Sequence, residues 1–109
     1  MNPAPDPSVV EKKIAAIEAE MKRIGYWSAS PLPDEAYDFR QAFAMDTMAF
    51  SQWLQFILIP RVRQIISERG EFPTDSMVGV QAMREFDGDE NAADLVSLLG
   101  EFDRLFTGR

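Results

Sequence analysis

The feature that most constrains this chain is a short apolar stretch, Trp53 to Ile59, in which Gln55 is the one polar side chain. In an α-helix these side chains would point in nearly every direction around the axis. Such a helix needs cover on several sides, which the other segments of the chain must supply. The stretch therefore predicts a buried helix at the centre of the molecule, over about residues 50–69.

Proline and glycine residues predict how this central helix is shaped and where it ends. Pro60 has no N–H to donate to the carbonyl of Phe56, and its ring would crowd that carbonyl, so we expect a kink. Gly70 follows the last amphipathic turn and Pro73 lies shortly beyond it, which is typical of a helix end.

A charged helix is predicted before the central one, over about residues 8–25. Ser8 followed by Glu11 forms a capping box, in which the hydroxyl and the carboxylate each satisfy a backbone N–H at the helix start. Large apolar residues then recur at steps of four and three and trace one narrow stripe. The inward residues expected from this spacing are Val10, Ile14, Ile17, Met21 and Ile24.

Two further helices are predicted after the central one. The first begins at Asp75 or Ser76, and the second is capped by Asp89 or Asn91 and closes before Gly108. The inward residues expected from their spacing are Met77, Val80, Met83 and Phe86 in the first, and Leu95, Leu98, Leu99, Phe102, Leu105 and Phe106 in the second.

These elements predict an all-α fold, a compact bundle of about four helices around a central, buried, proline-kinked helix. A chain of 109 residues suits one domain. Residues 1–7 contain three prolines and nothing to bury, so we expect a flexible N-terminal arm there and a single helical-bundle domain over residues 8–109.

The segment from Tyr26 to Ala49 has no clear period but is rich in aromatic residues. Its composition predicts a connection that is pinned against the core and is compatible with a short helix over about residues 34–44. Asp46 and Thr47 precede the central helix and offer side-chain oxygens, so we expect them to cap it.

The composition excludes several classes of chemistry. The chain has no cysteine and no histidine, which removes disulfides, thiolate nucleophiles, the usual general base and the commonest metal ligands. The glycines do not have the spacing of a dinucleotide or phosphate loop. We therefore expect no catalytic residue, no metal and no cofactor, and an enzyme is the least favoured class.

The net charge of −7 disfavours direct binding of nucleic acid, because it repels a phosphate backbone at long range. The first residues lack the basic and apolar regions of a secretory signal. The longest apolar run is far shorter than the roughly 20 residues of a membrane span. We therefore expect a cytoplasmic protein without a membrane segment.

Two acidic patterns resemble chemical sites without completing them. The run from Asp87 to Asn91 begins like a calcium loop, but Ala92 and Leu98 stand at the sixth and twelfth positions, where a glycine and a bidentate carboxylate are needed. A turn followed by a helix cap is favoured instead. Carboxylate pairs such as Glu18 with Glu20 point apart on a helix and are interpreted as solvated surface.

Two residue sets leave alternatives open. The basic residues Arg61, Arg63, Arg69, Lys12, Lys13, Lys22 and Arg23 could form a local patch that meets RNA, although ordinary surface pairing with acids is favoured. The set Met45, Met48, Phe50, Trp53 and Phe56 could fill the core, which is favoured, or form a partly exposed groove for a partner.

One motif resembles the signature of a known family. The string Phe43-x-x-Asp46-Thr47-Met48-x-x-x-x-Trp53-Leu54-Gln55-x-x-Leu58-Ile59-Pro60-Arg61 is similar to that of the YqcC-like family of small bacterial proteins. The chain length, the charged first helix and the leucine-rich last helix agree with it. The resemblance implies a small helical bundle without assigned activity that is associated with tRNA pseudouridine synthase C.

That association does not imply catalysis by this chain. A pseudouridine synthase needs a catalytic aspartate in a large mixed α/β fold, so Asp46 is not interpreted as such a nucleophile. Packing and capping explain most of the motif, but Gln55 and Arg61 are harder to explain in this way. We therefore take Asp46, Trp53, Gln55 and Arg61 as candidate partner-binding residues.

Two functions are compatible with these patterns. The first is a non-enzymatic interaction or accessory module whose partner is a protein, with a tRNA-modifying enzyme such as the pseudouridine synthase as the candidate. The alternative is a helical domain that binds a small apolar ligand in a pocket beside the Pro60 kink, oriented by Gln55. The sequence does not determine the oligomeric state.

Overall fold

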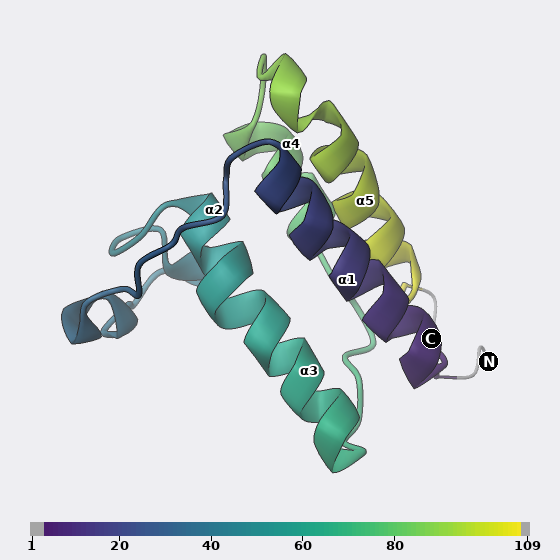
Figure 1. Ribbon diagram of the computed structural model, residues 1–109. Coiled ribbons are helices and arrows are strands. Elements are labelled where there is room, and N and C mark those ends of the chain that lie inside the picture. Colours follow the sequence, from purple (N-terminus) through teal and green to yellow (C-terminus); the bar gives the residue numbers. More distant parts are fainter. Residues whose placement is uncertain (1–3, 108–109) are drawn as a thin grey trace.

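The computed structural model describes residues 4–107, which form helices joined by loops and contain no β-strand (Figure 1). The helices are α1 (Pro7–Arg23), α2 (Phe50–Trp53), a π-helical segment (Leu54–Leu58), α3 (Ile59–Glu68), α4 (Val78–Glu85) and α5 (Ala93–Arg104). Short 3₁₀ turns cover Asp34–Tyr37, Ala42–Ala44 and Glu90–Ala92. Since α2, the π-helical segment and α3 are continuous, residues 4–107 form four helical units, which confirms the predicted fold class.

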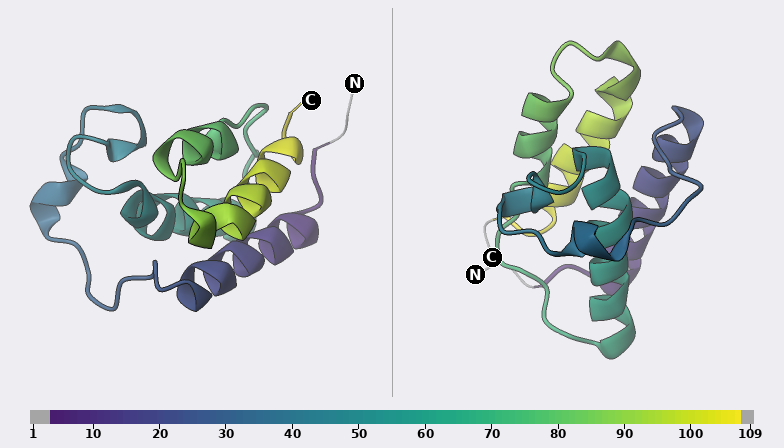
Figure 2. Two further views of the ribbon diagram at one scale, coloured as in Figure 1. Left: turned by 90° about the horizontal axis from the view of Figure 1, so that it is seen from above. Right: turned by 90° about the vertical axis from the view of Figure 1, so that its left-hand side faces the viewer.

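The helices pack in an order that differs from their order along the chain. Figure 1 shows α1 and α5 side by side and antiparallel, with α3 on the other side of α1. Figure 2 shows α4 lying against α5, and this is the most extensive helix pair in the molecule. The segment between α1 and α2 extends away from the bundle beside α2 (Figure 2). An ion pair of 3.0 Å between Lys13 of α1 and Glu101 of α5 adds to the contact between these two helices.

The central helix is buried, as predicted. Six of the seven side chains from Trp53 to Ile59 are buried, and Phe56 is half-buried. The expected irregularity at Pro60 takes the form of a wide π turn, in which the N–H of Ile59 donates to the carbonyl of Leu54 five residues earlier. A wide turn of this kind accommodates a proline because the helix no longer requires the N–H that proline lacks.

Helix α1 begins earlier than predicted and uses a different cap. Asp6, not Ser8, is the capping residue, and its Oδ1 atom accepts a hydrogen bond of 2.8 Å from the N–H of Ser8. Pro7 is the first helical residue, where its fixed φ suits the helix and its missing N–H is not needed. Pro7 therefore belongs to α1 and not to the predicted arm. Residues 1–3 of that arm lie outside the described residues.

The predicted inward face of α1 is confirmed, but that of α4 is wrong except at Phe86, which packs against the core. Val10, Ile14, Ile17 and Met21 are fully buried in α1. In α4 the buried residues are Val78, Gly79 and Ala82, whereas Met77, Val80 and Met83 are exposed. The reason lies in the close approach of α4 to α5, which small side chains permit and methionines would prevent. A Cβ atom at Gly79 would lie 2.8 Å from the Cα of Gly100.

The aperiodic segment is held to the core by aromatic residues, as predicted. The ring of Phe43 packs edge-on against Trp53 with 4.9 Å between centroids, and Phe50 stacks on Trp53 at 5.8 Å. Phe43 and its neighbour Ala44 both adopt positive φ, which turns the chain sharply before α2. The helix expected over about residues 34–44 is reduced to two short 3₁₀ turns.

Candidate partner-binding surface

The four candidate residues do not share one exposed face. Trp53 and Gln55 are each 8% exposed, whereas Asp46 and Arg61 lie on the surface. The structure brings Trp53 and Arg61 together at one pocket and places Asp46 and Gln55 in two other local contacts. Two of the four therefore have internal structural roles, and each of the four needs a separate account.

Asp46 closes a turn in the connection and does not cap the central helix. Its carboxylate accepts hydrogen bonds from the N–H of Arg40 over 3.0 Å and from that of Gln41 over 3.3 Å. The bond from Arg40 lowers the pKa of Asp46 below its ordinary value. The helix is capped instead by Gln52, whose Oε1 atom accepts from the N–H of Ala49 over 2.8 Å. The predicted cap was therefore wrong.

Gln55 joins the central helix to the segment that follows α1. Its Oε1 atom accepts from the N–H of Ser28 over 2.8 Å, and its Nε2 atom donates to the carbonyl of Ser28 over 2.9 Å. Both functional groups of this buried amide are thus paired with one backbone residue. The polar residue in the apolar stretch is explained by this contact, and Gln55 does not orient a ligand beside Pro60.

Trp53 and Arg61 line a pocket of about 530 Å³ between the central helix and the segment that leads into α4. The apolar part of its wall includes Leu58, Val62 and Phe102. Arg61 stands on the exposed side of α3 at this pocket, together with Asp75 from the opposite segment. A largely apolar pocket with a few charges at its rim is typical of ligand and peptide sites.

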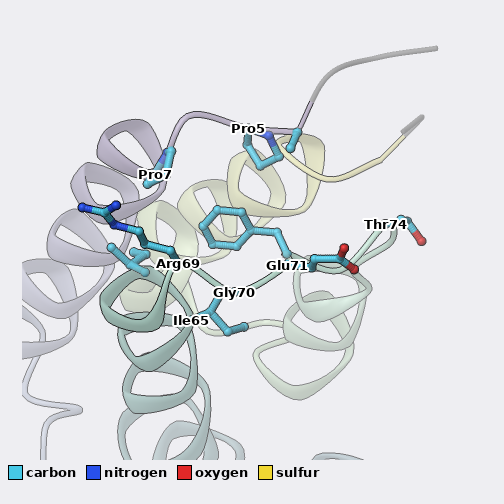
Figure 3. Close-up of a pocket in the computed structure, with 10 residues that line it drawn as sticks. Pro5, Pro7, Ile65, Arg69, Gly70, Glu71 and Thr74 are labelled. Atoms are coloured by element: carbon cyan, nitrogen blue, oxygen red, sulfur yellow. The ribbon is translucent and has the colours of Figure 1, made fainter.

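A second pocket, of about 720 Å³, lies at the end of α3. Figure 3 shows Pro5 and Pro7 on one side of it and Ile65 and Gly70 on the other. The chain from Pro5 into α1 thus lies over the last turns of α3. Ile65 lines this pocket and also the pocket at Trp53, so both pockets border the same helix.

The structure reveals an apolar surface that was not predicted from the sequence. Of the six large apolar side chains that are exposed among residues 4–107, four lie on or beside α4. These are Met45 at 51%, Met77 at 54%, Val80 at 40% and Met83 at 64% exposure. Met45 comes from the aperiodic segment, and its sulfur lies 3.8 Å from the Nε2 atom of Gln81 on α4. We call these four residues the methionine surface.

A shallow groove accompanies the methionine surface. It has a volume of about 350 Å³, lies between α4 and α5, and is lined by Val80, Met83, Val96 and Arg104 among others. Met77 lines this groove and also the pocket at Trp53 and Arg61, so the two depressions are neighbours. The sequence did contain a signal: Gly79, Ala82 and Gly100 are small residues that mark the true contact face.

Asp103 is a second feature that was not predicted. It is buried, and its carboxylate accepts hydrogen bonds from the Oγ of Ser76 over 2.5 Å and from the N–H groups of Val78 over 3.1 Å and Gly79 over 2.7 Å. These donors belong to the start of α4, so a side chain of α5 caps a neighbouring helix. Because three donors hold this buried carboxylate, Asp103 has a structural role, and it lies at the groove.

Several of the basic residues that could have formed a patch are held in ion pairs. Lys22 pairs with Glu18, Arg23 with Glu20, and Arg63 with Glu18, each within 2.8 Å. Ordinary surface pairing therefore accounts for much of the basic set that the sequence left open. Within residues 4–107 no group of three or more acidic side chains is arranged to hold a metal ion.

None of the helices in the described part of the chain is both long enough and apolar enough to cross a membrane. Together, the fold and the surface define a small all-helical domain with an exposed apolar face on α4. Comparison with solved structures supports this class. The solution NMR structure of protein YqcC from Escherichia coli superposes with a TM-score of 0.82 and 26% sequence identity, covering 92% of this chain and 86% of that chain.

Sequence comparisons give the family. A family model, DUF446, described as tRNA pseudouridine synthase C, matches residues 9–105. The chain therefore belongs to this YqcC-like family, as its central motif indicated. The description is a label of the family and states no activity of this chain.

Individual relatives are similar at 25–30% identity. An uncharacterized protein of Haemophilus influenzae is 25% identical over 79 residues, which are 70% of this chain and 74% of that protein. Uncharacterized protein YqcC of Escherichia coli is 30% identical over 64 residues, 59% of each chain. A protein of Pectobacterium carotovorum named tRNA pseudouridine synthase C is 27% identical over 64 residues, which are 59% of this chain but 17% of that protein.

Proposed function

We propose that this chain is a non-catalytic accessory module that binds a tRNA pseudouridine synthase. The observation that carries the proposal is the match to the Pectobacterium protein of that name, in which the similar segment is a small part of a much longer chain. A segment within one polypeptide is held beside the rest at high effective concentration. A separate domain of similar sequence can occupy the same place through non-covalent contacts.

Charge supports such a partnership. An enzyme that acts on tRNA needs a basic surface to meet the phosphate backbone. This chain carries a net charge of −7, so long-range attraction would speed its encounter with a basic protein. The same charge opposes direct contact with the RNA. A partnership of this kind places the chain in the cytoplasm, where such an enzyme meets its substrate.

The use of the acidic side chains supports a non-catalytic role. The carboxylate of Asp46 is held by two backbone N–H groups in a surface turn, and that of Asp103 by the first turn of α4. These hydrogen bonds are made to the chain's own backbone, so each carboxylate has a structural role. Both acids are explained by the fold itself.

Binding between the purified full-length chain and the tRNA pseudouridine synthase C of the same organism tests the proposal. Isothermal titration calorimetry at low and at moderate salt is expected to give saturable binding that weakens as salt rises. A second RNA-modifying enzyme of similar net charge serves as the control for non-specific attraction. Absence of binding to the synthase at both salt concentrations, or equal binding to the control enzyme, contradicts the proposal.

A second candidate function is favoured by the pocket at Trp53 and Arg61. Its volume of about 530 Å³ lies within the range of small-molecule sites, and its walls are mostly apolar. We propose an apolar molecule as its ligand, with Arg61 at the rim, beside Glu71 and Asp75, to bind an acceptor group of that molecule. This candidate differs from the sequence-based alternative in its orienting residue, which is Arg61 and not Gln55.

Titration with the fluorescent dye anilinonaphthalene sulfonate tests the second candidate. The native chain is expected to bind the dye saturably, and Arg61→Glu to weaken the binding by removing the cation that faces the sulfonate. Arg40→Glu changes the same charge at an exposed position outside the pocket and is expected to have no effect. Equal weakening by both variants contradicts a specific site.

A further inference from the structure

The methionine surface is unusual because it holds four of the six large apolar residues that are exposed among residues 4–107. Scattered exposed apolar residues are ordinary in soluble proteins, but a contiguous group indicates an interaction site. Met45, Met77 and Met83 are all more than half exposed, and Val80 lies between the latter two along α4. Methionine side chains are flexible and polarizable, so they adapt to the shape of a partner.

The fold requires this face of α4 to be outward. Gly79 must face α5, because a Cβ there would meet the backbone of Gly100 at 2.8 Å and the carboxylate of Asp103 at 2.9 Å. With Gly79 and Ala82 turned inward, the larger residues Val80 and Met83 are turned toward solvent. Their exposure is therefore fixed by packing and is not an accident of a loose helix.

Two arginines on or beside this surface are available to a partner, as Lys12, Arg40, Arg61 and Arg69 are elsewhere among residues 4–107. Among residues 4–107, Lys13, Lys22, Arg23 and Arg63 all form ion pairs. Arg84 on α4 and Arg104 in the groove are exposed, and neither takes part in an ion pair within that range. A guanidinium group beside an apolar groove is suited to receive a carboxylate through paired hydrogen bonds.

We propose that the methionine surface and the α4–α5 groove together dock a short amphipathic segment of the synthase, with its apolar side chains in the groove and a carboxylate on Arg104. The inference rests on the proposed function, since it takes the synthase as the partner, and it adds the site and the chemistry of the docked segment. A helix or strand that lies in an apolar groove commonly anchors itself by a few side chains.

A second copy of this chain fits the same surface less well. In a two-fold dimer both chains would bring a net charge of −7 and would repel each other at long range. A segment that carries a carboxylate neutralises the arginines instead. Arg84 and Arg104 therefore favour a segment of a different protein that combines apolar side chains with a carboxylate.

Titration of the synthase against variants of the full-length chain tests the inference. Met83→Glu places a carboxylate in the groove, and Arg104→Glu reverses the charge at its rim; each is expected to weaken binding at least about tenfold. Val9→Glu makes the same kind of change at an exposed apolar residue of α1, outside the groove, and is expected to leave binding unchanged. Circular dichroism melts establish that each variant remains folded.

A second measurement covers the case in which a variant does not fold. Methyl NMR of the native chain with labelled methionines is expected to show shifts at Met77 and Met83 when the synthase is added. Met21, which is fully buried in α1, serves as the internal reference and is expected to stay in place. Shifts confined to other methionines overturn the inference.

The outcomes separate the two proposals. If the native chain does not bind the synthase, both the proposed function and this site are wrong. If it binds and Met83→Glu and Arg104→Glu bind equally well, the site alone is wrong. Sedimentation that shows a dimer dispersed by Met83→Glu, with synthase binding unchanged, assigns the surface to a second copy and overturns the inference. Methyl shifts at Met77 and Met83 produced by tRNA alone overturn it as well.

Discussion

The Oδ2 atom of Asp103 accepts a hydrogen bond of 2.7 Å from the N–H of Gly79 and so joins the last turns of α5 to the first turn of α4. The other oxygen of the carboxylate binds the N–H of Val78 and the hydroxyl of Ser76. Helix α4 has no capping side chain of its own, because its capping position is Met77. A distant acid supplies the cap and at the same time sets the distance between the two helices.

Asp103→Asn is expected to destabilise the fold. The amide keeps one acceptor oxygen but places an NH₂ group where the backbone donors converge, so at least one buried donor loses its partner. The expected loss is about 1–3 kcal/mol in the free energy of unfolding. Urea unfolding followed by circular dichroism measures it.

Asp94→Asn is the matched control for that change. Asp94 lies in the first turn of the same helix, its side chain is exposed, and its one ion pair, with Arg23, is 3.9 Å long. A surface change of this kind is expected to alter the free energy of unfolding by no more than about 0.5 kcal/mol. Equal losses from the two variants would show that Asp103 does not act as a cap.

The two helical glycines, Gly79 and Gly100, are expected to respond in opposite directions to alanine. A Cβ at Gly79 would meet backbone atoms of Gly100 at 2.8 Å, whereas a Cβ at Gly100 has a flexible atom of Arg104 at 3.8 Å as its nearest contact. Gly79→Ala should therefore cost about 1–3 kcal/mol by forcing α4 and α5 apart. Gly100→Ala should stabilise by up to about 1 kcal/mol through helix propensity.

Thermal melts of the two alanine variants give this comparison directly, because each adds one methyl group to a helix. A loss of stability in Gly100→Ala as large as that in Gly79→Ala would contradict the asymmetric packing of the two glycines. A stabilised Gly79→Ala variant would show that α4 can shift without cost.

The sequence predicted the helical units and the central core because large apolar residues there recur with a clean helical period. It failed for α4, where Met77, Val80 and Met83 have the right spacing for a buried face. Size decided the outcome, since the contact with α5 admits Gly79 and Ala82 but not methionine. A rule based on hydrophobicity alone does not contain that distinction.

The contacts of the four candidate residues could be predicted only where they follow from local helical spacing. Trp53 and Arg61 are two helical turns apart, so their common pocket follows from local spacing. Gln55 was chosen because packing did not explain it, and Asp46 was expected to cap the central helix. Their partners, Ser28 and the backbone at Arg40, come from loops without a period. Contacts of loops with distant residues depend on the whole fold, which a single sequence pattern does not give.

Gln55→Ala is expected to loosen the segment after α1. The change removes both hydrogen bonds to Ser28, so the N–H and carbonyl of Ser28 must bond to water instead. The expected loss in the free energy of unfolding is about 1–3 kcal/mol. Hydrogen exchange followed by NMR should show faster exchange at Ser28 and its neighbours, with α5 unchanged.

Gln64→Ala is the control for the loss of an amide side chain, because Gln64 is exposed and bonds only to Glu68 on its own helix. It should leave the exchange at Ser28 as it is. Unchanged exchange in Gln55→Ala would mean that the aromatic contacts, and not this amide, hold the segment.

Glu18 connects α1 to α3 through charge, and this contact makes stability depend on pH. Its carboxylate pairs with Lys22 over 2.8 Å and with Arg63 over 2.8 Å. The hydrogen bond from Lys22, and then that from Arg63, lower the pKa of Glu18 below its ordinary value. A carboxyl whose pKa is lower in the folded state stabilises the fold above its ordinary pKa, and this contribution disappears as the pH falls through the lower, folded value.

Glu18→Gln should therefore destabilise the chain at neutral pH and have little effect in acid. The loss at about pH 7 is expected to be no more than about 1 kcal/mol, because the pairs are partly exposed to solvent. It should shrink as the pH falls through the ordinary carboxyl pKa toward the lower, folded value, because Glu18 becomes protonated over that range. Urea unfolding at about pH 7 and about pH 3 measures the difference, with exposed Glu35→Gln as control. A difference between Glu18→Gln and the native chain that stays constant across this range would show that Glu18 acts through packing and not through its charge.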